Sequence, residues 1–504
     1  MIEIKNLTIT MLENNRTLLE NFNFVLNNGD KVAIIGEEGN GKSTLLKTIY
    51  DKRVVEGYCS ISGNINKKGI VIGYFDQFLN PGWNDQYVYE YFLKDNPEDE
   101  IDYEKYNDLA EVKNKLSLLK IDPKKIEEEQ KIGTLSGGEK VKIQLAKLLM
   151  KNPGVLLLDE PTNDLDIETL EWLETFINSA EIPIIFISHD ETLLERTANT
   201  IIHLEQLKKK NESKYTTEKI GYSDYVEKRL GALQKQEQIA QNEKRYFKRE
   251  MQTLKEIKNK VQKKNPDRIN RMNSIIAQEK KLGNTDLTES PDVEEAIKFN
   301  FNENIAIPNG KIILDYKKDS LKIGDKEILR DISLIIKGPE KVVIIGKNGV
   351  GKSTLFKDFY NILKDRDDIT LGYMPQNYGD FLDAKMNAST YLNESGTKEE
   401  ETRVRMYMGS MKFTGDEMLT AIENLSGGQK AKLLLLKMIL TNSNVLLLDE
   451  PTRNLSPLSN PVVRGILKNY GGTIISVSHD RKFINEVCDI VYELNENGIK
   501  KTII

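Results

Sequence analysis

The stretch KVAIIGEEGNGKSTLL at residues 31–46 recurs as KVVIIGKNGVGKSTLF at residues 341–356. Both copies fit the pattern GxxxxGK[ST], in which glycines let backbone amides turn toward phosphate oxygens and a helix then begins. In each copy an apolar, strand-like run comes before the motif and a helical pattern follows it. A glycine-rich turn that binds nothing is the alternative for one isolated match, but two matches in the same context indicate two nucleotide sites.

Three further segments recur in the same order and at matching spacing. They are TLSGGEKVKIQLAKLLM at 134–150 with NLSGGQKAKLLLLKMIL at 424–440, VLLLDEPTNDL at 155–165 with VLLLDEPTRNL at 445–455, and FISHD at 186–190 with SVSHD at 476–480. The two phosphate-loop lysines lie 310 residues apart, and 24 residues separate the LSGG serine from the LLLDE glutamate in both copies. Apolar strands alternate with amphipathic helices, so the sequence predicts two copies of an α/β domain with largely parallel strands.

Composition narrows the class of protein. The 504 residues suffice for two or three domains, and 39% apolar and 30% charged residues are typical of a soluble globular protein. The longest apolar runs have the length of buried strands, and the opening MIEIKNLTIT reads as a strand and not as a signal peptide. The two cysteines, Cys59 and Cys488, form no disulfide framework or metal pattern. We therefore expect a cytoplasmic protein.

A basic segment separates the copies. We expect the repeated domains at 1–207 and 301–504, with a linker at 208–300. Residues 222–282 carry 16 Lys or Arg and 8 Asp or Glu, whereas the whole chain has a net charge of −6. Apolar residues spaced three or four apart predict two antiparallel helices, the first of ~40 residues. Their tip is expected near 254–268, where Asn265-Pro266 breaks the helix.

The charge of this tip has two interpretations. A solvated charged helix is the ordinary one. One sign of charge in an otherwise acidic chain instead favours contact with phosphates, and the lack of a base-reading motif favours RNA over a specific DNA sequence. The predicted RNA-binding residues are Lys248, Arg249, Lys255, Lys258, Lys260, Lys263, Lys264, Arg268 and Arg271.

The repeated motifs carry the parts that phosphoryl transfer needs, which are positioning, a metal ion and charge neutralisation. The motif lysines would reach the β- and γ-phosphates, and the following serines would ligate Mg²⁺. Asp159 and Asp449 would hold the same ion, and Glu160 and Glu450 would polarise the attacking water. The predicted phosphate-binding residues are Gly36, Glu37, Glu38, Gly39, Asn40, Gly41, Lys42, Ser43 and Thr44, and Gly346, Lys347, Asn348, Gly349, Val350, Gly351, Lys352, Ser353 and Thr354.

With LSGGE and LSGGQ added, the motif set resembles the ATP-binding-cassette (ABC) superfamily across both copies. This resemblance implies that two cassettes face each other and that each ATP lies between the phosphate loop of one and the LSGG turn of the other. It also implies metal and water contacts for Gln77 and Gln376, and γ-phosphate contacts for His189 and His479. One composite site then joins Lys42, Ser43, Gln77, Asp159, Glu160 and His189 to Ser426, Gly427 and Gly428, and the other joins Lys352, Ser353, Gln376, Asp449, Glu450 and His479 to Ser136, Gly137 and Gly138.

Two cassettes joined by a basic helical hairpin resemble the ABC-F family of ribosome-associated ATPases, and YSDYVEKR at 222–229 is similar to that family's linker start. The resemblance implies a monomer whose paired cassettes bind ATP and Mg²⁺, and a bacterial 70S ribosome as partner. By this resemblance the protein would bind at the tRNA exit (E) site of the ribosome, with the hairpin reaching the peptidyl-transferase centre, 23S rRNA and the P-site tRNA. Hydrolysis would release it.

Several departures leave alternatives open. The segment from Gln77 to Ser136 is only nine residues longer than its counterpart in the second copy, and 24 residues follow Asp480. Such reduced arms resemble the members that protect ribosomes from antibiotics. A housekeeping translation factor, or the ATPase subunit of a transporter with a separate membrane partner, is the alternative.

Two further departures concern the nucleotide sites. The stretches TITMLENNRTLL and LKIGDKEIL show no clear aromatic residue for stacking on adenine, so other nucleotides stay possible. Ser456 of the second copy replaces the acid that Asp166 supplies in the first copy.

Overall fold

The computed structural model describes residues 2–104, 109–126, 130–207, 212–262, 272, 274–278, 280, 288, 291, 293, 301, 305, 307–323, 326–495 and 498–503. The chain forms two compact units. One comprises Met1–Tyr222 with Ile297–Ile504 and contains both repeated copies, and the other is Ser223–Ala296. None of the described helices combines the length and apolar character needed to cross a membrane.

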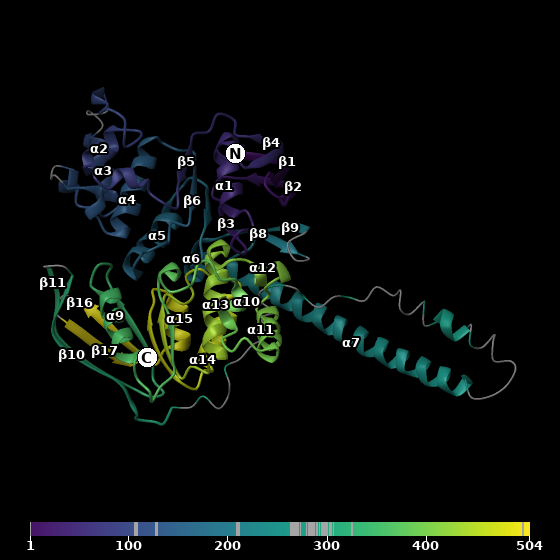
Figure 1. The fold of residues 1–504 in the computed structure, drawn as a ribbon. Helices are drawn as coiled ribbons and strands as arrows, with labels where there is room; N and C mark the ends of the chain where they lie inside the picture. Colours follow the sequence, from purple (N-terminus) through teal and green to yellow (C-terminus); the bar gives the residue numbers. More distant parts are fainter. Residues whose placement is uncertain are drawn as a thin grey trace. The chain divides into compact units, whose positions relative to one another are not determined.

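The first copy is built on two sheets (Figure 1). Strands β1 (Ile2–Met11), β2 (Thr17–Leu26) and β4 (Cys59–Asn66) form an antiparallel sheet in the order β2-β1-β4. The larger sheet has the order β5-β6-β7-β3-β8-β9, formed by Ile72–Phe75, Val155–Asp159, Ile184–Ile187, Lys31–Ile35, Thr200–Leu207 and Glu212–Glu218. All its neighbours are parallel except β8 and β9. The sheet therefore continues beyond residue 207, where the sequence suggested that the domain ends.

Polar caps and an apolar core explain the helices of the first copy. The helices are α1 (Lys42–Tyr50), α2 (Val88–Leu93), α3 (Leu109–Leu118), α4 (Gly137–Met150), α5 (Ile167–Ser179) and α6 (Glu191–Thr197). Asp166 and Asp190 accept backbone N–H groups at the starts of α5 and α6, where such caps are favoured. Strands β3, β6 and β7 are fully buried, and one apolar cluster joins α1 to both sheets. This core fixes the start of α1 at the end of β3.

The second copy repeats this plan. Its six-stranded sheet has the order β13-β14-β15-β12-β16-β17, formed by Leu371–Met374, Val445–Asp449, Thr473–Val477, Lys341–Gly346, Ile490–Asn495 and Gly498–Ile503, and β10 (Ile312–Ile323) pairs with β11 (Lys326–Lys337). The helices are α9 (Lys352–Leu363), α10 (Ala388–Leu392), α11 (Lys398–Ser410), α12 (Gly415–Leu419), α13 (Gly427–Leu440), α14 (Asn460–Lys468) and α15 (Arg481–Val487). The prediction of two α/β domains with mainly parallel strands is confirmed.

The second unit is dominated by α7 (Tyr222–Gln262), a helix of 41 residues that begins in the first unit. Leu254 on α7 is 8% exposed, and Ile275, in the helical stretch 274–278, is 5% exposed. The spacing of three or four residues places Ile276, four after Met272, on the apolar face of the second predicted helix, but Ile276 is exposed. The backbone N–H of Thr288 donates to Glu243 Oε2 at 2.7 Å, so the chain returns to α7 at this residue. The turn expected at Asn265-Pro266 lies outside the described residues, and the hairpin stays a prediction.

Candidate functional site

Each phosphate loop lies between the central strand of a six-stranded sheet and the helix that follows it, β3 with α1 and β12 with α9. Gly41 and Gly351 precede the helices with φ of 86° and 96°, a left-handed conformation that glycine adopts without strain. A Cβ on Gly36 would lie 2.3 Å from the carbonyl oxygen of Leu204, so no other residue fits there. Neither helix has a side-chain cap at its first turn. The first-turn N–H groups are therefore placed to bind an anion.

The lysine of each loop is buried and folds back onto its own loop. Lys42 Nζ donates to the carbonyl oxygens of Gly36 and Glu37 at 2.9 and 3.0 Å. Lys352 Nζ donates to the carbonyl oxygens of Gly346 and Lys347 at 2.7 and 3.0 Å. Burial lowers the pKa of Lys352. Both ammonium groups thus lie inside the loops that the sequence assigned to phosphate binding.

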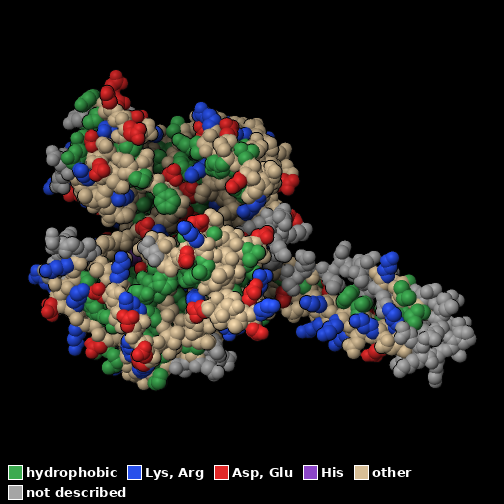
Figure 2. All heavy atoms as spheres, in the orientation of Figure 1, with side chains coloured by type: hydrophobic (Ala, Val, Ile, Leu, Met, Phe, Trp, Pro, Cys, Tyr) green, Lys and Arg blue, Asp and Glu red, His purple; other side chains and the backbone are tan. Residues whose placement is uncertain are grey.

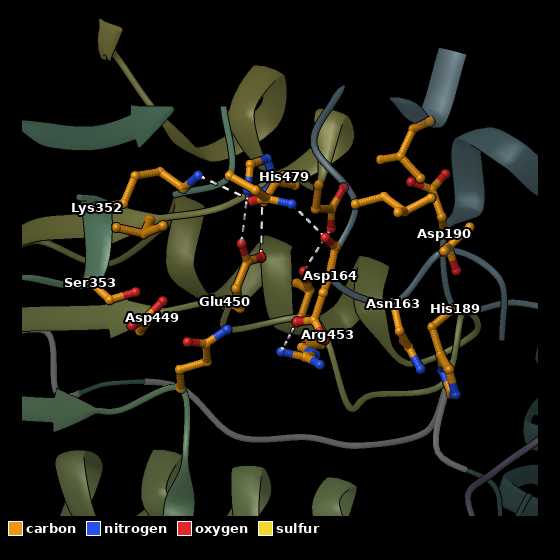
Figure 3. A pocket seen from close by; sticks show the side chains of 18 of the residues that line it. Asn163, Asp164, His189, Asp190, Lys352, Ser353, Asp449, Glu450, Arg453 and His479 are labelled. Atoms are coloured by element: carbon orange, nitrogen blue, oxygen red, sulfur yellow. Dashed lines mark hydrogen bonds and ion pairs between the residues drawn. The ribbon is translucent and has the colours of Figure 1, made fainter. Parts of the chain in front are cut away.

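A serine and an aspartate meet beside each loop. Ser43 Oγ donates to Asp159 Oδ1 at 2.9 Å, and the hydroxyl of Tyr74 donates to Asp159 Oδ2 at 3.1 Å. Figure 3 shows Ser353 and Asp449 pointing toward each other in the second copy. Burial raises the pKa of Asp159 and of Asp449 to about 6 in each case. Each aspartate therefore lies where a cation would favour its charged form.

The two glutamate–histidine pairs differ. His189 Nε2 lies 3.0 Å from Glu160 Oε1, whereas His479 Nε2 lies 3.8 Å from Glu450 Oε1. Burial acts to raise the pKa of Glu160, but His189 and Lys42 outweigh it and hold the pKa below its ordinary value. Burial, reinforced by the Asp449 carboxylate, raises the pKa of Glu450 to about 8. The paired acids predicted from the sequence thus have unlike surroundings.

The two LSGG segments, which we call signature turns, open helices α4 and α13. Ser136 and Ser426 each cap their helix in a capping box, with Glu139 and Gln429 respectively. Gly428 N donates to Glu38 Oε2 at 2.8 Å, so the second signature turn contacts the first phosphate loop. These caps place the turns' remaining N–H groups at the helix N-termini.

The reciprocal contact brings the second phosphate loop to the first copy. Asn348 Nδ2 donates to the carbonyl oxygen of Asp164, and a Cβ on Gly137 would lie 3.8 Å from that Nδ2. His189 Nδ1 also lies 2.7 Å from the carbonyl oxygen of Leu455. Contacts in both directions therefore join each loop to the opposite copy.

Two cavities collect part of the predicted sites, and neither is lined by Asp159 or by the predicted signature-turn residues Ser136, Gly137, Gly138, Ser426, Gly427 and Gly428. One is lined by Lys42, Ser43, Gln77, Glu160 and His189 together with Arg453 and Asn454 of the second copy. The other is lined by Lys352, Ser353, Gln376, Asp449, Glu450 and His479 together with Asn163 and Asp164 of the first (Figure 3). Each cavity thus combines the loop of one copy with residues that follow the LLLDEP strand of the other.

The chain matches the family model described as "ABC transporter" at residues 19–163 and 329–453, which is more than half of its length. It is 30% identical to the ATP-binding protein Uup of Buchnera aphidicola subsp. Acyrthosiphon pisum, over 100% of this chain and 82% of Uup. It is 27% identical to ABC transporter F family member 2 of Arabidopsis thaliana, over 96% of this chain and 75% of that protein.

The chain belongs to the ABC-F family. Its paired ABC cassettes make this ABC-F protein an ATPase. Its fold is similar to that of the archaeal ribosome recycling factor aABCE1, solved with the ribosomal stalk protein aP1. That comparison has a TM-score of 0.59 and 17% identity and covers 99% of this chain and 90% of aABCE1. At that identity the similarity concerns the tandem-cassette fold.

The oxygen donors of each cassette fit Mg²⁺. In the first cassette Ser43 Oγ and Asp159 Oδ1 are 2.9 Å apart, and Glu160 Oε2 is buried without a partner among the described residues. The described residues contain no group of three or more His, Cys, Asp or Glu side chains that could hold a metal ion. Mg²⁺ commonly binds one or two protein oxygens and completes its shell with phosphates and water. The ABC-F sites fit that mode, in which a bound nucleotide would supply the remaining ligands.

Some cavity residues were not predicted from the sequence. Met11, Leu18 and Tyr58 line the cavity around Lys42 and give it an apolar wall beside the phosphate loop. Tyr58 reaches this place because β4 pairs with β1, with Cys59 opposite Met11. The sequence around the first strands does not reveal Tyr58 as a cavity residue, because the pairing of β1 with β4 is not visible in the sequence. Arg453 was also missed, and it pairs with Asp164 at 2.9 Å.

Proposed function

We propose that this ABC-F ATPase binds the bacterial 70S ribosome at the E site, with ATP closing the cassettes and hydrolysis releasing the protein. The observation that carries the proposal is the basic surface of α7. Lys248, Arg249 and Lys255 are exposed, and Lys and Arg side chains gather along α7 on the face seen in Figure 2. In a chain with a net charge of −6, such a surface suits the phosphates of RNA. The similar protein aABCE1 is itself named a ribosome recycling factor.

In the proposed reaction each ATP lies between one phosphate loop and the opposite signature turn. Lys42 and Lys352 neutralise the phosphates, and Ser43, Asp159, Ser353 and Asp449 hold Mg²⁺, with Gln77 and Gln376 beside them. Glu160 and Glu450 orient the attacking water, and His189 and His479 contact the γ-phosphate. The distances within the Ser43–Asp159 and Glu160–His189 pairs support these roles. The ion supplies charge neutralisation at the developing negative charge.

The linker is proposed to form a hairpin that reaches the peptidyl-transferase centre, 23S rRNA and the P-site tRNA. The hydrogen bond from Thr288 to Glu243 supports this, because the midpoint between these residues falls at Asn265-Pro266. Of the predicted RNA contacts, Lys258 is partly buried. Lys263, Lys264, Arg268 and Arg271, and the side chain of Lys260, lie outside the described residues.

Protection of the ribosome from antibiotics is the proposed physiological role. The short segment between Gln77 and Ser136 supports it, since it holds only α2 and α3 as α-helices among its described residues. A ribosome-bound protein would act in the cytoplasm. Expression in a susceptible bacterium should raise resistance to at least one of the lincosamides, pleuromutilins, streptogramins or phenicols. Unchanged sensitivity to all four would instead favour a translation factor.

Ribosome binding is tested by trapping the ATP-bound state. The Glu160→Gln/Glu450→Gln variant keeps the size of both side chains and one acceptor oxygen on each, and it removes their charge. With ATP it should sediment with 70S ribosomes, and with ADP it should stay in the supernatant. A trapped variant that stays free of ribosomes with ATP would rule out the proposal. Co-purification with a membrane protein would support the transporter alternative.

The linker charges are tested in the same background. Replacing Lys258, Lys260, Lys263 and Lys264 by Gln should leave ATP binding unchanged and weaken ribosome binding. A matched control replaces four basic residues outside the linker, Lys5, Lys68, Lys113 and Lys385, which keeps the total charge equal. Equal ribosome binding by the linker variant and the control would show that the linker charges have no special role.

A further inference from the structure

A cluster of charged side chains joins helices α5 and α6 of the first cassette to α14 and α15 of the second. Arg464 donates to both carboxylate oxygens of Glu191, with Nη2 3.2 Å from Oε2. Both side chains are almost completely buried, at 3% and 4% exposure. Arg481 Nη2 donates to Glu174 Oε1 and lies 3.3 Å from Asp190 Oδ1. Two Arg–Glu pairs therefore bridge the cassettes.

These pairs are equivalent by the internal repeat. Residues 155–204 and 445–494 align without a gap, and the matching positions begin β6 and β14, β8 and β16, and α6 and α15. Glu174, Glu191 and Arg196 of the first cassette then correspond to Arg464, Arg481 and Glu486 of the second. Arg196 pairs with Glu174 at 2.9 Å, and Arg464 pairs with Glu486 at 2.9 Å. Exchanging the cassettes thus reproduces both bridging pairs and both internal pairs with the sign of all six charges reversed.

The reversed charges discriminate between possible partners. If two first cassettes paired in this geometry, Glu174 would face Glu191. If two second cassettes paired, Arg464 would face Arg481. Like charges brought together out of water are strongly unfavourable, whereas removing an opposite charge leaves a buried ion without compensation. Only a first cassette against a second cassette satisfies the whole cluster.

We propose that these six residues, which we call the charge-reversed joint, select pairing between unlike cassettes and hold that pair together without nucleotide. The joint lies on the helices that follow the LLLDEP and SHD segments, and none of its residues belongs to a phosphate loop or signature turn. A buried ion pair often adds little stability compared with apolar residues, and its best-established use is to specify a partner. The partner in this case is the second cassette of the same chain. The inference is independent of the ribosome.

Two full-length half-reversed variants test the joint. Glu174→Arg/Glu191→Arg/Arg196→Glu gives the first cassette the charges of the second. Arg464→Glu/Arg481→Glu/Glu486→Arg gives the second cassette the charges of the first. Each variant keeps the opposite charges of its internal pair and changes only the pairing between cassettes. Thr192→Lys accompanies the first variant and Lys482→Thr the second, because Lys482 lies 3.4 Å from Glu191.

Pairing is read without nucleotide from energy transfer between dyes on cysteines introduced at the exposed positions Glu98 and Glu399, one in each cassette. Both native cysteines are buried. Each half-reversed variant should lose the high-transfer population of the native chain, and the fully reversed variant should regain it. An equimolar mixture of the two half-reversed chains should give a species of twice the mass by light scattering. Both cassettes of one chain then carry charges complementary to those on both cassettes of the other chain.

The outcomes distinguish selection of the partner cassette from a general contribution to the stability of the cassette pair. Native energy transfer in both half-reversed variants would overturn the inference, and so would a mixture that stays at the mass of one chain. Circular dichroism checks that each variant folds. If a half-reversed variant does not fold, the fully reversed chain still decides, because loss of native energy transfer in that chain contradicts charge complementarity as the cause.

Discussion

Glu38 is expected to compete with ATP in the first composite site. Its carboxylate accepts the N–H of Gly428, the second residue of α13, at 2.8 Å. In the proposed closed state that N–H faces the γ-phosphate. The equivalent position in the second cassette is Asn348, a neutral residue that instead donates to the carbonyl oxygen of Asp164. ATP must therefore displace an anion in one site only.

The size of the effect follows from the contact. A hydrogen bond to a charged group contributes ~1.5–3 kcal/mol, and the partial positive charge of a helix N-terminus adds ~0.3–1 kcal/mol. Glu38 is exposed, so solvent reduces this to about 1 kcal/mol. A free-energy difference of ~1.4 kcal/mol corresponds to a tenfold change in a binding constant. Glu38→Asn should therefore lower the half-saturating ATP concentration for closure of the cassettes roughly fivefold.

The assay uses the Glu160→Gln/Glu450→Gln background, so that ATP binds without turnover, and follows closure by energy transfer between the two cassettes. Asn348→Glu in the same background is the matched control, and it should raise the half-saturating concentration at the other site. If Glu38→Asn raised that concentration, or left it unchanged, the carboxylate would be a stabilising contact of the closed state and not a competitor of the phosphate.

Three further predictions concern the first phosphate loop, the start of α7 and the basic residues of α7. Gly36→Ala should abolish binding of a fluorescent ATP analogue at the first site, because the added Cβ would lie 2.3 Å from the carbonyl oxygen of Leu204. Gly39→Ala should have a smaller effect, because the added Cβ meets no atom within 4 Å. Tyr222→Phe should lower the free energy of unfolding by ~1–3 kcal/mol in urea titrations, since it leaves the buried carbonyl of Pro457 without its hydrogen bond at 3.0 Å; a change below ~0.5 kcal/mol would contradict this. Replacing Lys248, Arg249 and Lys255 by Gln should reduce the slope of log K against log salt for ribosome binding by up to about 3, and an unchanged slope would show that they meet no phosphate.

The sequence could predict those parts of the fold that depend on local pattern and internal repetition. Apolar runs such as Val155–Asp159 had to be buried strands, and the glycines of the phosphate loops fixed the turn into the next helix. The repeat also brought the loop lysines, the aspartates and the glutamates to the same end of each sheet. The two copies could be found because each motif depends on spacing within a short segment.

Contacts between distant segments could not be predicted in this way. Tyr58 reaches the cavity of Lys42 through the register of β4 against β1. The buried pair of Glu191 and Arg464 unites residues 273 positions apart, and each alone looks like an ordinary surface charge on a helix. Helical periodicity could not choose between Ile275 and Ile276, because neighbouring positions differ by only 100° around the helix axis. Such choices depend on the partner surface.

Some of the differences between the two cassettes lie where the cassettes meet. In the first cassette Asp166 caps α5 by accepting the Thr169 N–H at 3.0 Å. Ser456 takes the equivalent place in the second, where Pro457 follows it and accepts the Tyr222 hydroxyl. The carbonyl oxygen of Leu455, two residues before Pro457, accepts a hydrogen bond from His189 Nδ1. The other ring nitrogen of His189, Nε2, lies 3.0 Å from Glu160 Oε1. A short series of hydrogen bonds and chain links therefore connects Glu160 to the first residue of α7. The histidine that corresponds to His189 is His479, whose Nδ1 has no hydrogen-bond partner among the described residues. Tyr222 begins α7, so these contacts link the surroundings of Glu160 to the first residue of that helix.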